Sequence, residues 1–368
     1  MSGSPTILII GGGIAGLSTA WWLARSQAVQ VVLLEREVQL ATHSSALNAA
    51  ILRTLDADPE TTAILERSAD FLRQPPSGFS EHKLVETCGL VLTADEGRAA
   101  QDMARWVDHC APSSMVEVLD PKRLREVAPF FAGDDQRAWL FPREGRLDVA
   151  HLCDSLARGA REAGAKILTG KSGSVRELFR QGNEICGVKL SDGSTLRADT
   201  VVLAAGGWAD KLGRAAGSKI RMQPRRRHLL VTEADASVDP NWPIVWRHGS
   251  DFYCRPESGG MLLCGCDNDD VAEPDTLVRD HSTLGTIAEK TALNIPQFAD
   301  AGAAHWWCGM RTSAPDGRFV VRFDPDLAGL FWVAGLGGHG MSAGVEVGRL
   351  ATEQLLASIG GKRPPILA

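Results

Sequence analysis

The 368-residue sequence lacks the patterns that mark a metal site or a disulfide framework. Its eight cysteines form no CxxC pair and no combination with histidine at zinc-ligand spacing. Cys264 and Cys266 are separated by one residue, which is too close for an ordinary disulfide and is not a zinc pattern. We therefore expect no bound metal, reduced thiols and a cytoplasmic location.

Long apolar runs and an excess of basic charge are also missing. No segment is long enough to span a bilayer, and the first apolar run has the length of a strand and follows no basic stretch, so neither a membrane span nor a secretory signal is expected. The formal net charge of −6 with interspersed signs gives no reason to expect nucleic acid as a partner. The short basic run at 224–228 suits a local anion site better. The oligomeric state is left open.

A glycine-rich turn at residues 11–16 is the feature around which the rest of the chain is organised. Residues 7–10 predict a short buried strand, and residues 17–24 continue with helical character. The GxGxxG spacing allows a tight turn, close approach of the backbone to a pyrophosphate and close packing of helix on strand, and the amides of the helix start attract phosphate. The residues expected to contact a cofactor here are Gly11, Gly13, Ile14, Ala15 and Gly16.

A second apolar segment, residues 29–35, ends in an acidic residue where this motif requires one. Glu35 follows the glycines by about twenty residues, so its carboxylate would accept hydrogen bonds from an adenosine ribose. The combination predicts a dinucleotide-binding unit. The alternative is a solvated glutamate at the end of an ordinary strand, with glycines that only shape a turn.

Polar residues follow directly in the segment 42–55. We expect a helix to begin in this segment, and we expect Ser44, Ser45 and Asn48 to donate hydrogen bonds to phosphate and ribose oxygens at its entry. A plain serine cap is the alternative.

The order of the predicted elements, together with the chain length, predicts two domains in an α/β (α+β) protein. A βα unit at 147–167, strands at 174–180, 184–190 and 194–208, and a strand at 330–334 fit one interrupted nucleotide-binding domain. Alternating segments after residue 222 fit an antiparallel sheet. The nucleotide-binding domain is expected at 1–80, 145–221 and 302–368, and the substrate-binding domain at 81–144 and 222–301.

A second glycine-rich turn, residues 335–340, precedes a predicted helix at 341–356. A helix start aimed at the C2 carbonyl and N1 of an isoalloxazine ring would stabilise the negative charge of a reduced flavin. A nicotinamide enzyme has no obvious need for this distant second helix start. The pattern favours FAD over NAD.

Five ordered motifs together resemble one family over nearly the whole chain. After GxGxxG with LLERE come HSS, VVLAAGGW, CGMRTSAPDGR and FWVAGLGGHGMSAG. The sequence resembles the D-amino-acid-oxidase superfamily of flavoproteins, and within it the glycine oxidases, sarcosine oxidases and bacterial D-arginine dehydrogenases. The resemblance implies a glutathione-reductase-like Rossmann FAD domain interleaved with an antiparallel-sheet substrate domain, and oxidation of a Cα–N bond to an imine that water hydrolyses.

The resemblance also assigns roles to residues that face the substrate. Arg311 falls on the arginine that holds the substrate carboxylate, and Tyr253 falls on a tyrosine that hydrogen-bonds the same group. The alternatives are a loop arginine on the surface and a half-buried strand tyrosine. Arg227 falls on a further substrate-facing arginine, with Arg226 as a possible register error and a purely structural role as the alternative.

The resemblance further implies that FAD is held noncovalently. The position of the attachment cysteine in sarcosine oxidases corresponds to Gly309, and Cys308, one residue before it on a strand, would face the opposite side. We interpret Cys308 as a packing residue. The remaining expected cofactor residues are Arg36, His43, Ala49, Val175, Ala205, Gly206, Trp208, Gly309, Arg311, Gly337, Gly338, His339, Gly340 and Met341.

The sequence differs from the D-arginine dehydrogenases at positions that would contact the side chain of the substrate. Leu90 and Ile51 stand where those enzymes have a glutamate and a histidine, and an apolar wall cannot satisfy a guanidinium. Arg53 and Trp246 add a cation and an aromatic surface. We therefore expect a substrate with one carboxylate, an apolar portion and a second acidic group near Arg53 or Arg227, such as an N-carboxymethyl amino acid.

Such chemistry needs orientation and charge stabilisation more than a side-chain base. His339 is expected beside the flavin, either as a donor or as a residue that contacts only backbone. The expected acceptor is O₂ or another oxidant. Two other classes stay open, namely a flavoprotein that oxidises a 2-hydroxy acid or a glycerophosphate, and a noncatalytic FAD-binding scaffold.

Overall fold

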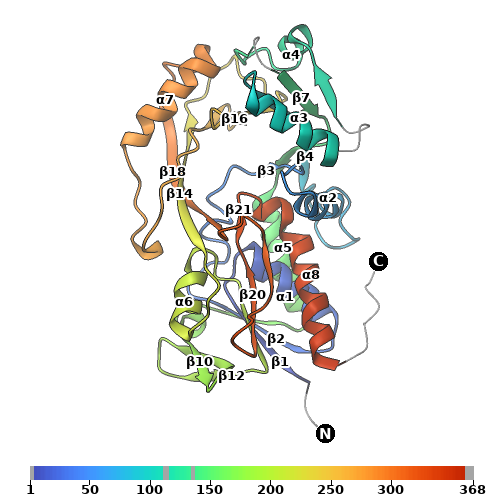
Figure 1. The fold of residues 1–368 in the computed structure, drawn as a ribbon, viewed down its shortest axis with the longest axis vertical. Helices are drawn as coiled ribbons and strands as arrows, with labels where there is room; N and C mark the ends of the chain where they lie inside the picture. Colours follow the sequence, from blue (N-terminus) through green and yellow to red (C-terminus); the bar gives the residue numbers. More distant parts are fainter. Residues whose placement is uncertain (1–3, 111–115, 134–136, 361–368) are drawn as a thin grey trace.

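The computed structural model describes residues 4–110, 116–133 and 137–360, so the ends of the expected nucleotide-binding domain, 1–3 and 361–368, lie outside it. One part of the molecule is built on a six-stranded sheet and the other on a nine-stranded sheet. The first part lies below the second in Figure 1. No helix in the described ranges is long and apolar enough to cross a membrane.

The six-stranded sheet is buried on both faces, which explains the continuous apolar run of its central strand. In the order across the sheet its strands are β19 (Val320–Phe323), β20 (Leu330–Ala334), β13 (Thr200–Leu203), β1 (Thr6–Ile10), β2 (Gln30–Glu35) and β9 (Lys166–Thr169). All neighbours are parallel except β19 and β20. Along β1, Ile7 and Ile9 enter one core while Leu8 and Ile10 enter the other, because side chains alternate along a strand.

Helices cover one face of this sheet, and a helix with a small sheet covers the other. The first layer comprises α1 (Ile14–Arg25), α2 (Pro59–Arg73), α5 (Val149–Glu162) and α8 (Gly340–Gly360). The opposite layer comprises α6 (Ala209–Ala216), β10 (Val175–Gln181), β11 (Glu184–Leu190) and β12 (Thr195–Arg197). Within the first layer α1 packs against α8 and α5, which places the starts of α1 and α8 near each other.

The nine-stranded sheet forms the second part of the molecule. In order its strands are β21 (Leu336–Gly337), β18 (Ala303–Ser313), β14 (Gln223–Thr232), β17 (Gly260–Cys264), β16 (Phe252–Glu257), β15 (Ile244–His248), β5 (Leu90–Ala94), β7 (Arg137–Phe141) and β6 (Glu117–Leu119). The helices beside it are α3 (Arg98–Cys110), α4 (Pro121–Val127) and α7 (Ser282–Asn294). The long strands β14 and β18 run from this part down to the first part in Figure 1.

The expected α/β fold class is confirmed by the mixed architecture of the two sheets. The predicted strand at 184–190 matches β11, and the predicted strand at 330–334 matches β20. A small sheet that was not predicted joins the two parts. Its strands are β3 (Ile51–Leu52), β8 (Gly145–Leu147) and β4 (Val85–Thr87).

The expectation of a helix in residues 42–55 is wrong. The chain there forms turns followed by β3. Asn48 explains the difference, because its Nδ2 donates to the carbonyl oxygen of Ser45 at 2.9 Å and its Oδ1 accepts from the amide of Ala50 at 2.7 Å. Such local side-chain bonds compete with helical backbone bonds.

The division of the chain into two domains stays a prediction. The expected return to the nucleotide-binding domain at residue 302 coincides with the start of β18, which pairs with β14 along the nine-stranded sheet. Only after β18 does the chain re-enter the six-stranded sheet, through β19 and β20.

Candidate functional site

A cavity of about 470 Å³ is lined by residues from both sheets. Of the residues expected to contact cofactor or substrate, all line it except Gly16, Leu90 and His339. The first glycine-rich turn, the second glycine-rich turn and the strands β14, β16 and β18 all contribute. The cavity therefore joins the expected cofactor site to the expected substrate site.

The first glycine-rich turn requires the absence of side chains at two positions. Gly11 has a φ of +109°, and a Cβ atom there would lie 2.4 Å from the carbonyl oxygen of Ala204. A Cβ atom on Gly16 would lie 1.9 Å from the carbonyl oxygen of Gly11. Gly16 thus acts behind the cavity wall, where it lets α1 pack directly on the turn.

The end of β2 and the segment after it form hydrogen bonds with the first glycine-rich turn that the sequence did not predict. The Oγ atom of Ser45 accepts a hydrogen bond from the amide of Ile14 at 2.9 Å, so Ser45 caps α1. The Glu35 carboxylate accepts from the amides of Gly12 at 2.7 Å and Glu37 at 2.8 Å. Glu35 lines the cavity with Ser44 and Ser45, at the end expected to hold adenosine.

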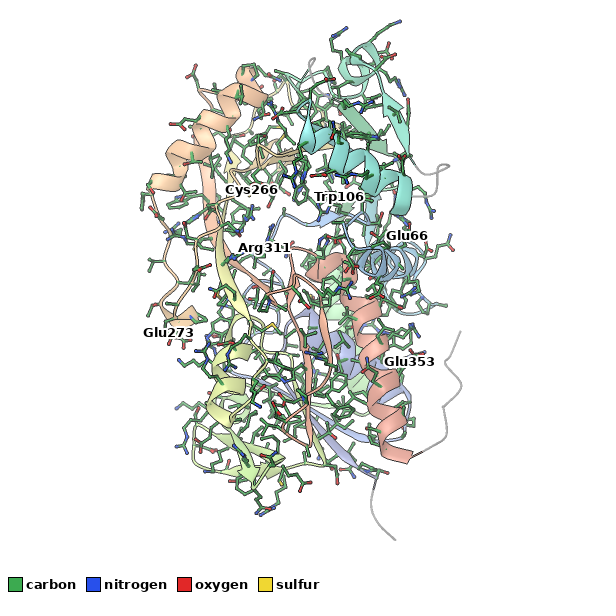
Figure 2. All side chains as sticks on the ribbon, viewed as in Figure 1. Glu66, Trp106, Cys266, Glu273, Arg311 and Glu353 are labelled. Carbon is green, nitrogen blue, oxygen red and sulfur yellow. The ribbon has the colours of Figure 1, made fainter. Side chains whose placement is uncertain are left out.

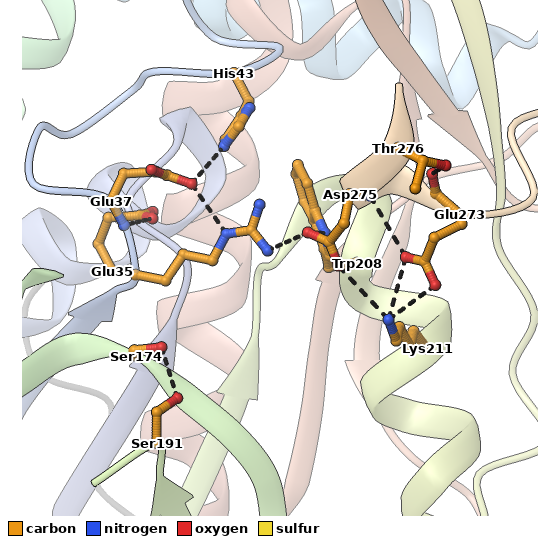
Figure 3. A network of polar contacts seen from close by, with 11 residues as sticks. Glu35, Glu37, His43, Ser174, Ser191, Trp208, Lys211, Glu273, Asp275 and Thr276 are labelled. Atoms are coloured by element: carbon orange, nitrogen blue, oxygen red, sulfur yellow. Dashed lines mark hydrogen bonds and ion pairs between the residues drawn. The ribbon is translucent and has the colours of Figure 1, made fainter. Parts of the chain in front are cut away.

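A polar network joins this end of the cavity to the second part of the molecule (Figure 3). Arg36 lies over the ring of Trp208 at 4.2 Å, and its Nη1 is 2.5 Å from Oδ1 of Asp275. The indole nitrogen of Trp208 donates to the same oxygen at 2.9 Å. Asp275 belongs to a short helix, η4 (Pro274–Thr276), between β17 and α7, so this connection crosses the adenosine end of the cavity.

At the other end, the second glycine-rich turn provides a surface for an arginine. A Cβ atom on Gly338 would lie 3.0 to 3.2 Å from the guanidinium atoms of Arg311, so the bare backbone makes room for that group. Burial lowers the pKa of Arg311, and the charge of Arg227 lowers it further. Among the described residues, no carboxylate forms an ion pair with Arg311 or Arg227.

Strand alternation decides which arginine of the basic run faces the cavity. Arg227 lines the cavity, whereas Arg226 points away from it and pairs with Asp269 and Asp280 at 2.8 and 3.0 Å. The side chain of Tyr253, also in the lining, is 4% exposed and its ring lies 4.7 Å from that of Trp246. The register predicted for Arg227 thus agrees with the geometry, while its role stays a prediction.

Arg53 is the third arginine at this end of the cavity, and it is half-buried. It stacks on Trp246 at 4.4 Å, and its Nη2 lies 2.8 Å from Nε2 of His339, which is itself 3.0 Å from Oδ2 of Asp56. Burial lowers the pKa of His339 to about 4, the charge of Arg53 contributes in the same direction, and Asp56 opposes both. His339 is therefore neutral at pH 7, and it positions Arg53 rather than lining the cavity.

The apolar wall expected from the sequence is present only in part. Ile51 lines the cavity, but Leu90 is fully buried within an apolar core behind it. Cys308 lies on the other face of β18 from Gly309, beside His228. Noncovalent attachment of a flavin stays a prediction that this arrangement favours.

Glu144 is a buried carboxyl group behind Arg53 and gives a testable pH dependence. Its Oε1 accepts from the Thr54 amide at 2.7 Å and hydroxyl at 2.6 Å, while its Oε2 has no hydrogen-bond partner among the described residues. Burial raises the pKa of Glu144 from 4.5 to about 7, against the opposing effects of Thr54 and Arg53. The folded protein therefore holds a proton that the unfolded chain releases.

The free energy of unfolding of the wild type should fall as the pH rises from 5 to 8. We expect it to fall less in Glu144→Gln. A raised carboxyl pKa stabilises the fold below 4.5 relative to pH values above 7, and a shift of this size corresponds to about 3 kcal/mol. Urea unfolding of both proteins at several pH values measures the difference. Parallel stability curves for the wild type and the variant would contradict the assignment.

The residues present fit a dinucleotide of the FAD type. The starts of α1 and α8 both lie at one cavity, which has the Glu35 carboxylate at one end and three arginines at the other. Two polar atoms of lining residues, Arg227 Nε and Thr312 Oγ1, are buried without a partner among the described residues. Buried polar atoms normally have hydrogen-bond partners, so these two atoms indicate that a polar group binds beside them.

Sequence reasoning missed lining residues that come from distant segments. Lys211 and Asp275 lie at the adenosine end, and Met310, Thr312 and Ser342 lie nearer the arginines. Met310 and Thr312 flank Arg311 and could have been suspected from that motif. Nothing in the local sequence of Asp275 signals its contact with Arg36.

Comparisons with known proteins agree with this geometry. A family model described as FAD dependent oxidoreductase, named DAO, matches residues 6–354. The chain is 24% identical to 4-methylaminobutanoate oxidase (formaldehyde-forming) from Paenarthrobacter nicotinovorans, covering 96% of this chain and 44% of that protein. It is 27% identical to the sarcosine oxidase beta subunit from an Arthrobacter species, covering 88% of this chain and 80% of that subunit. The chain thus spans less than half the length of the first relative.

Solved structures share the fold. L-Proline dehydrogenase from P. horikoshii superposes with a TM-score of 0.85 at 20% identity, covering 100% of this chain and 96% of that one. Iminodiacetate oxidase from Chelativorans sp. BNC1 superposes with a TM-score of 0.79 at 23% identity, covering 95% of each chain. The resemblance to a superfamily of flavoproteins that the motifs indicated is confirmed.

Proposed function

Because the chain belongs to the DAO family of FAD-dependent oxidoreductases, we propose that it oxidises the Cα–N bond of a small amino acid or an N-substituted glycine. The product is an imine, which water hydrolyses to a 2-oxo acid, such as glyoxylate, and an amine. The proposed acceptor is O₂, which is reduced to H₂O₂. Secondary amino acids are the favoured class, and N-carboxymethyl amino acids within it.

One observation carries this proposal. Arg227 is buried, Arg53 and Arg311 are half-buried, and all three line one cavity; among the described residues none of them has an ion-paired carboxylate. Buried unpaired charge is costly, so a site with this composition favours an anionic ligand. Arg311, held flat against Gly338, suits the bidentate geometry of a carboxylate.

The side chains of this chain bind and orient the substrate in the proposed reaction. Arg311 and Tyr253 hold its carboxylate and thereby fix the position of the Cα atom, and Ile51 and Trp246 exclude water around the amine. When bound, FAD would accept the hydride that leaves Cα, while the lone pair of the neutral amine nitrogen forms the C=N bond. The amine must be neutral to be oxidised, and no side-chain base is required.

Arg53 supports the choice of an N-carboxymethyl substrate. Its guanidinium is aligned by Trp246 and by neutral His339 at the edge of the cavity, and the two other arginines stand on β14 and β18. A substrate with carboxylates at both ends of a short secondary amine matches cations at separate positions. One of the solved structures that shares the fold is named as an oxidase of iminodiacetate, which is a compound of this class.

Anaerobic reduction of the bound flavin by a panel of compounds tests the function. The panel contains glycine, N-methylglycine, N-carboxymethyl amino acids, primary D-amino acids, 2-hydroxy acids and glycerophosphate. Loss of the visible flavin absorbance with the N-substituted glycines, followed by amine release, is the expected result. Reduction by a hydroxy acid alone, or by none of the compounds, would overturn the proposal.

Arg53→Met should change substrate preference more than overall activity. A charge-assisted hydrogen bond is worth roughly 1.5–3 kcal/mol, so kcat/KM for an N-carboxymethyl amino acid should fall by about 10- to 100-fold. N-Methylglycine has no second carboxylate and should lose much less. Steady-state kinetics with the two substrates measure the ratio. An equal loss for both would show that Arg53 does not bind the second acidic group.

A further inference from the structure

Two cysteines with no role in the proposed reaction lie directly behind its carboxylate site. Cys264 ends β17 and Cys266 follows it after one glycine, with a φ of +51° that belongs to the left-handed region. Their Sγ atoms are 3.8 Å apart, and the amide of Cys266 donates to Sγ of Cys264 at 3.3 Å. Figure 2 shows Cys266 and Arg311 at the junction between the two parts of the molecule.

The sulfur of Cys264 lies among groups that donate hydrogen bonds. The amide of Cys266 donates to this sulfur, the guanidinium of Arg227 can only donate, and Tyr253 lies opposite Cys264 in the ladder of β16 and β17. The S–H of a Cys264 thiol would donate to Sγ of Cys266, whereas a thiolate at Cys264 can accept from all of its neighbours. Burial alone raises the pKa of the Cys264 thiol, but the bond with Cys266, the charge of Arg227 and the bond with Tyr253 lower it overall.

The remaining charges of the region favour the same state. Arg227 forms no ion pair with a carboxylate among the described residues, and a thiolate at Cys264 offsets part of its buried charge, which leaves the cluster of three arginines with an excess of positive charge for a ligand. Burial raises the pKa of Cys266, and its neighbour Cys264 raises it further, so Cys266 keeps its proton. The pair therefore combines an activated sulfur with a thiol at contact distance.

We propose that Cys264 and Cys266 form a peroxide-reactive dithiol whose oxidation alters the carboxylate site. The thiolate of Cys264 attacks one oxygen of a hydroperoxide, which breaks the O–O bond, releases hydroxide or alkoxide, and leaves a sulfenic acid. The thiol of Cys266 then attacks that sulfur and expels water. In total two thiols lose two electrons and two protons, and the peroxide is reduced to water and water or alcohol.

Oxidation would change the shape of the carboxylate site because the two cysteines lie against residues that line the cavity. Tyr253 and Arg227 both line the cavity and both lie next to Cys264, so the sulfur is one residue away from the proposed carboxylate site. The one-residue spacing does not allow an ordinary disulfide without movement, so forming an S–S bond of about 2.05 Å requires the sulfurs to approach each other from 3.8 Å. That movement pulls Cys264 away from Arg227 and Tyr253.

The other described cysteines lack this arrangement. Cys254, on the neighbouring strand, is as buried as Cys264, but burial raises its pKa with no opposing donor. We therefore expect peroxide to react with the pair in preference to Cys254. Formation of peroxide by the enzyme itself rests on the proposed function with O₂ as the acceptor. The response to added peroxide does not depend on that function.

The test treats the FAD-loaded protein with a few equivalents of hydrogen peroxide under argon, then unfolds it in denaturant so that the buried thiols become accessible, alkylates the free thiols and measures the peptides by mass spectrometry. We expect Cys264 and Cys266 to lose two hydrogens jointly and to resist alkylation, and dithiothreitol to restore both. Replacing Cys266→Ala should trap a sulfenic acid on Cys264 that reacts with dimedone. With a working substrate, oxidation should lower kcat/KM about tenfold through KM.

Matched variants separate this chemistry from general damage. Cys264→Ser should abolish the response to peroxide, and Cys254→Ala should respond like the wild type. The proposal is overturned if both thiols remain open to alkylation after peroxide, or if Cys264→Ser keeps the response. Since the mass measurement needs no turnover, a failure of the dithiol proposal and a failure of the proposed function are distinguishable.

Discussion

Gly16→Ala should yield a protein that folds but does not retain FAD. Alanine is a better helix former than glycine, so α1 itself gains from the change. The added Cβ atom, however, would lie 1.9 Å from the carbonyl oxygen of Gly11, a backbone atom that cannot rotate away. The turn must shift, and overpacking of this kind costs about 3 kcal/mol, or roughly a hundredfold in FAD affinity.

Gly285→Ala is the matched control for this change. Gly285 also lies in a helix, α7, but a Cβ atom there meets nothing within 4 Å. The measurements are the flavin absorbance of the purified protein, its recovery after added FAD, and circular dichroism to establish folding. A yellow Gly16→Ala protein with unchanged FAD affinity would show that the glycine-rich turn does not bind the cofactor.

The six-stranded sheet could be predicted from the sequence because its strands are buried on both faces. Continuous apolar runs such as residues 7–10 have no other stable location in a chain of this composition. The choice of Arg227 came from the family resemblance, which left Arg226 open, and alternation along β14 places Arg227 on the cavity side and Arg226 on the other. The strands thus follow from local sequence, whereas the arginine needed the family motif.

The features that could not be predicted depend on contacts between distant segments. The segment 42–50 looked like a helix entry, yet Ser45 caps α1 instead, which needs the two segments to meet in space. Asp275 reaches Arg36 across 239 positions of sequence. The contacts of His339 with Arg53 and Asp56 were not predicted either, and its place beside the flavin stays a prediction. Tertiary packing decided all three.

Arg311→Met should nearly abolish turnover while FAD stays bound. The guanidinium lies against Gly338 with no carboxylate partner among the described residues, so its hydrogen bonds are available to a ligand. A bidentate carboxylate contact in a buried site is worth about 4 kcal/mol, which predicts a fall in kcat/KM of about a thousandfold. Arg311→Lys keeps the charge but loses the fork, and should recover only part of the activity.

Arg225→Met provides the control for Arg311, because the two residues face each other in the ladder of β14 and β18. Arg225 is paired with Asp270 at 3.1 Å on the surface, and such exposed pairs contribute little. Its kinetics should match those of the wild type. Since uniform binding and positioning of the Cα atom affect the rate differently, the loss in Arg311→Met should appear in both kcat and KM. A loss confined to KM would mean that Arg311 binds the substrate without orienting it.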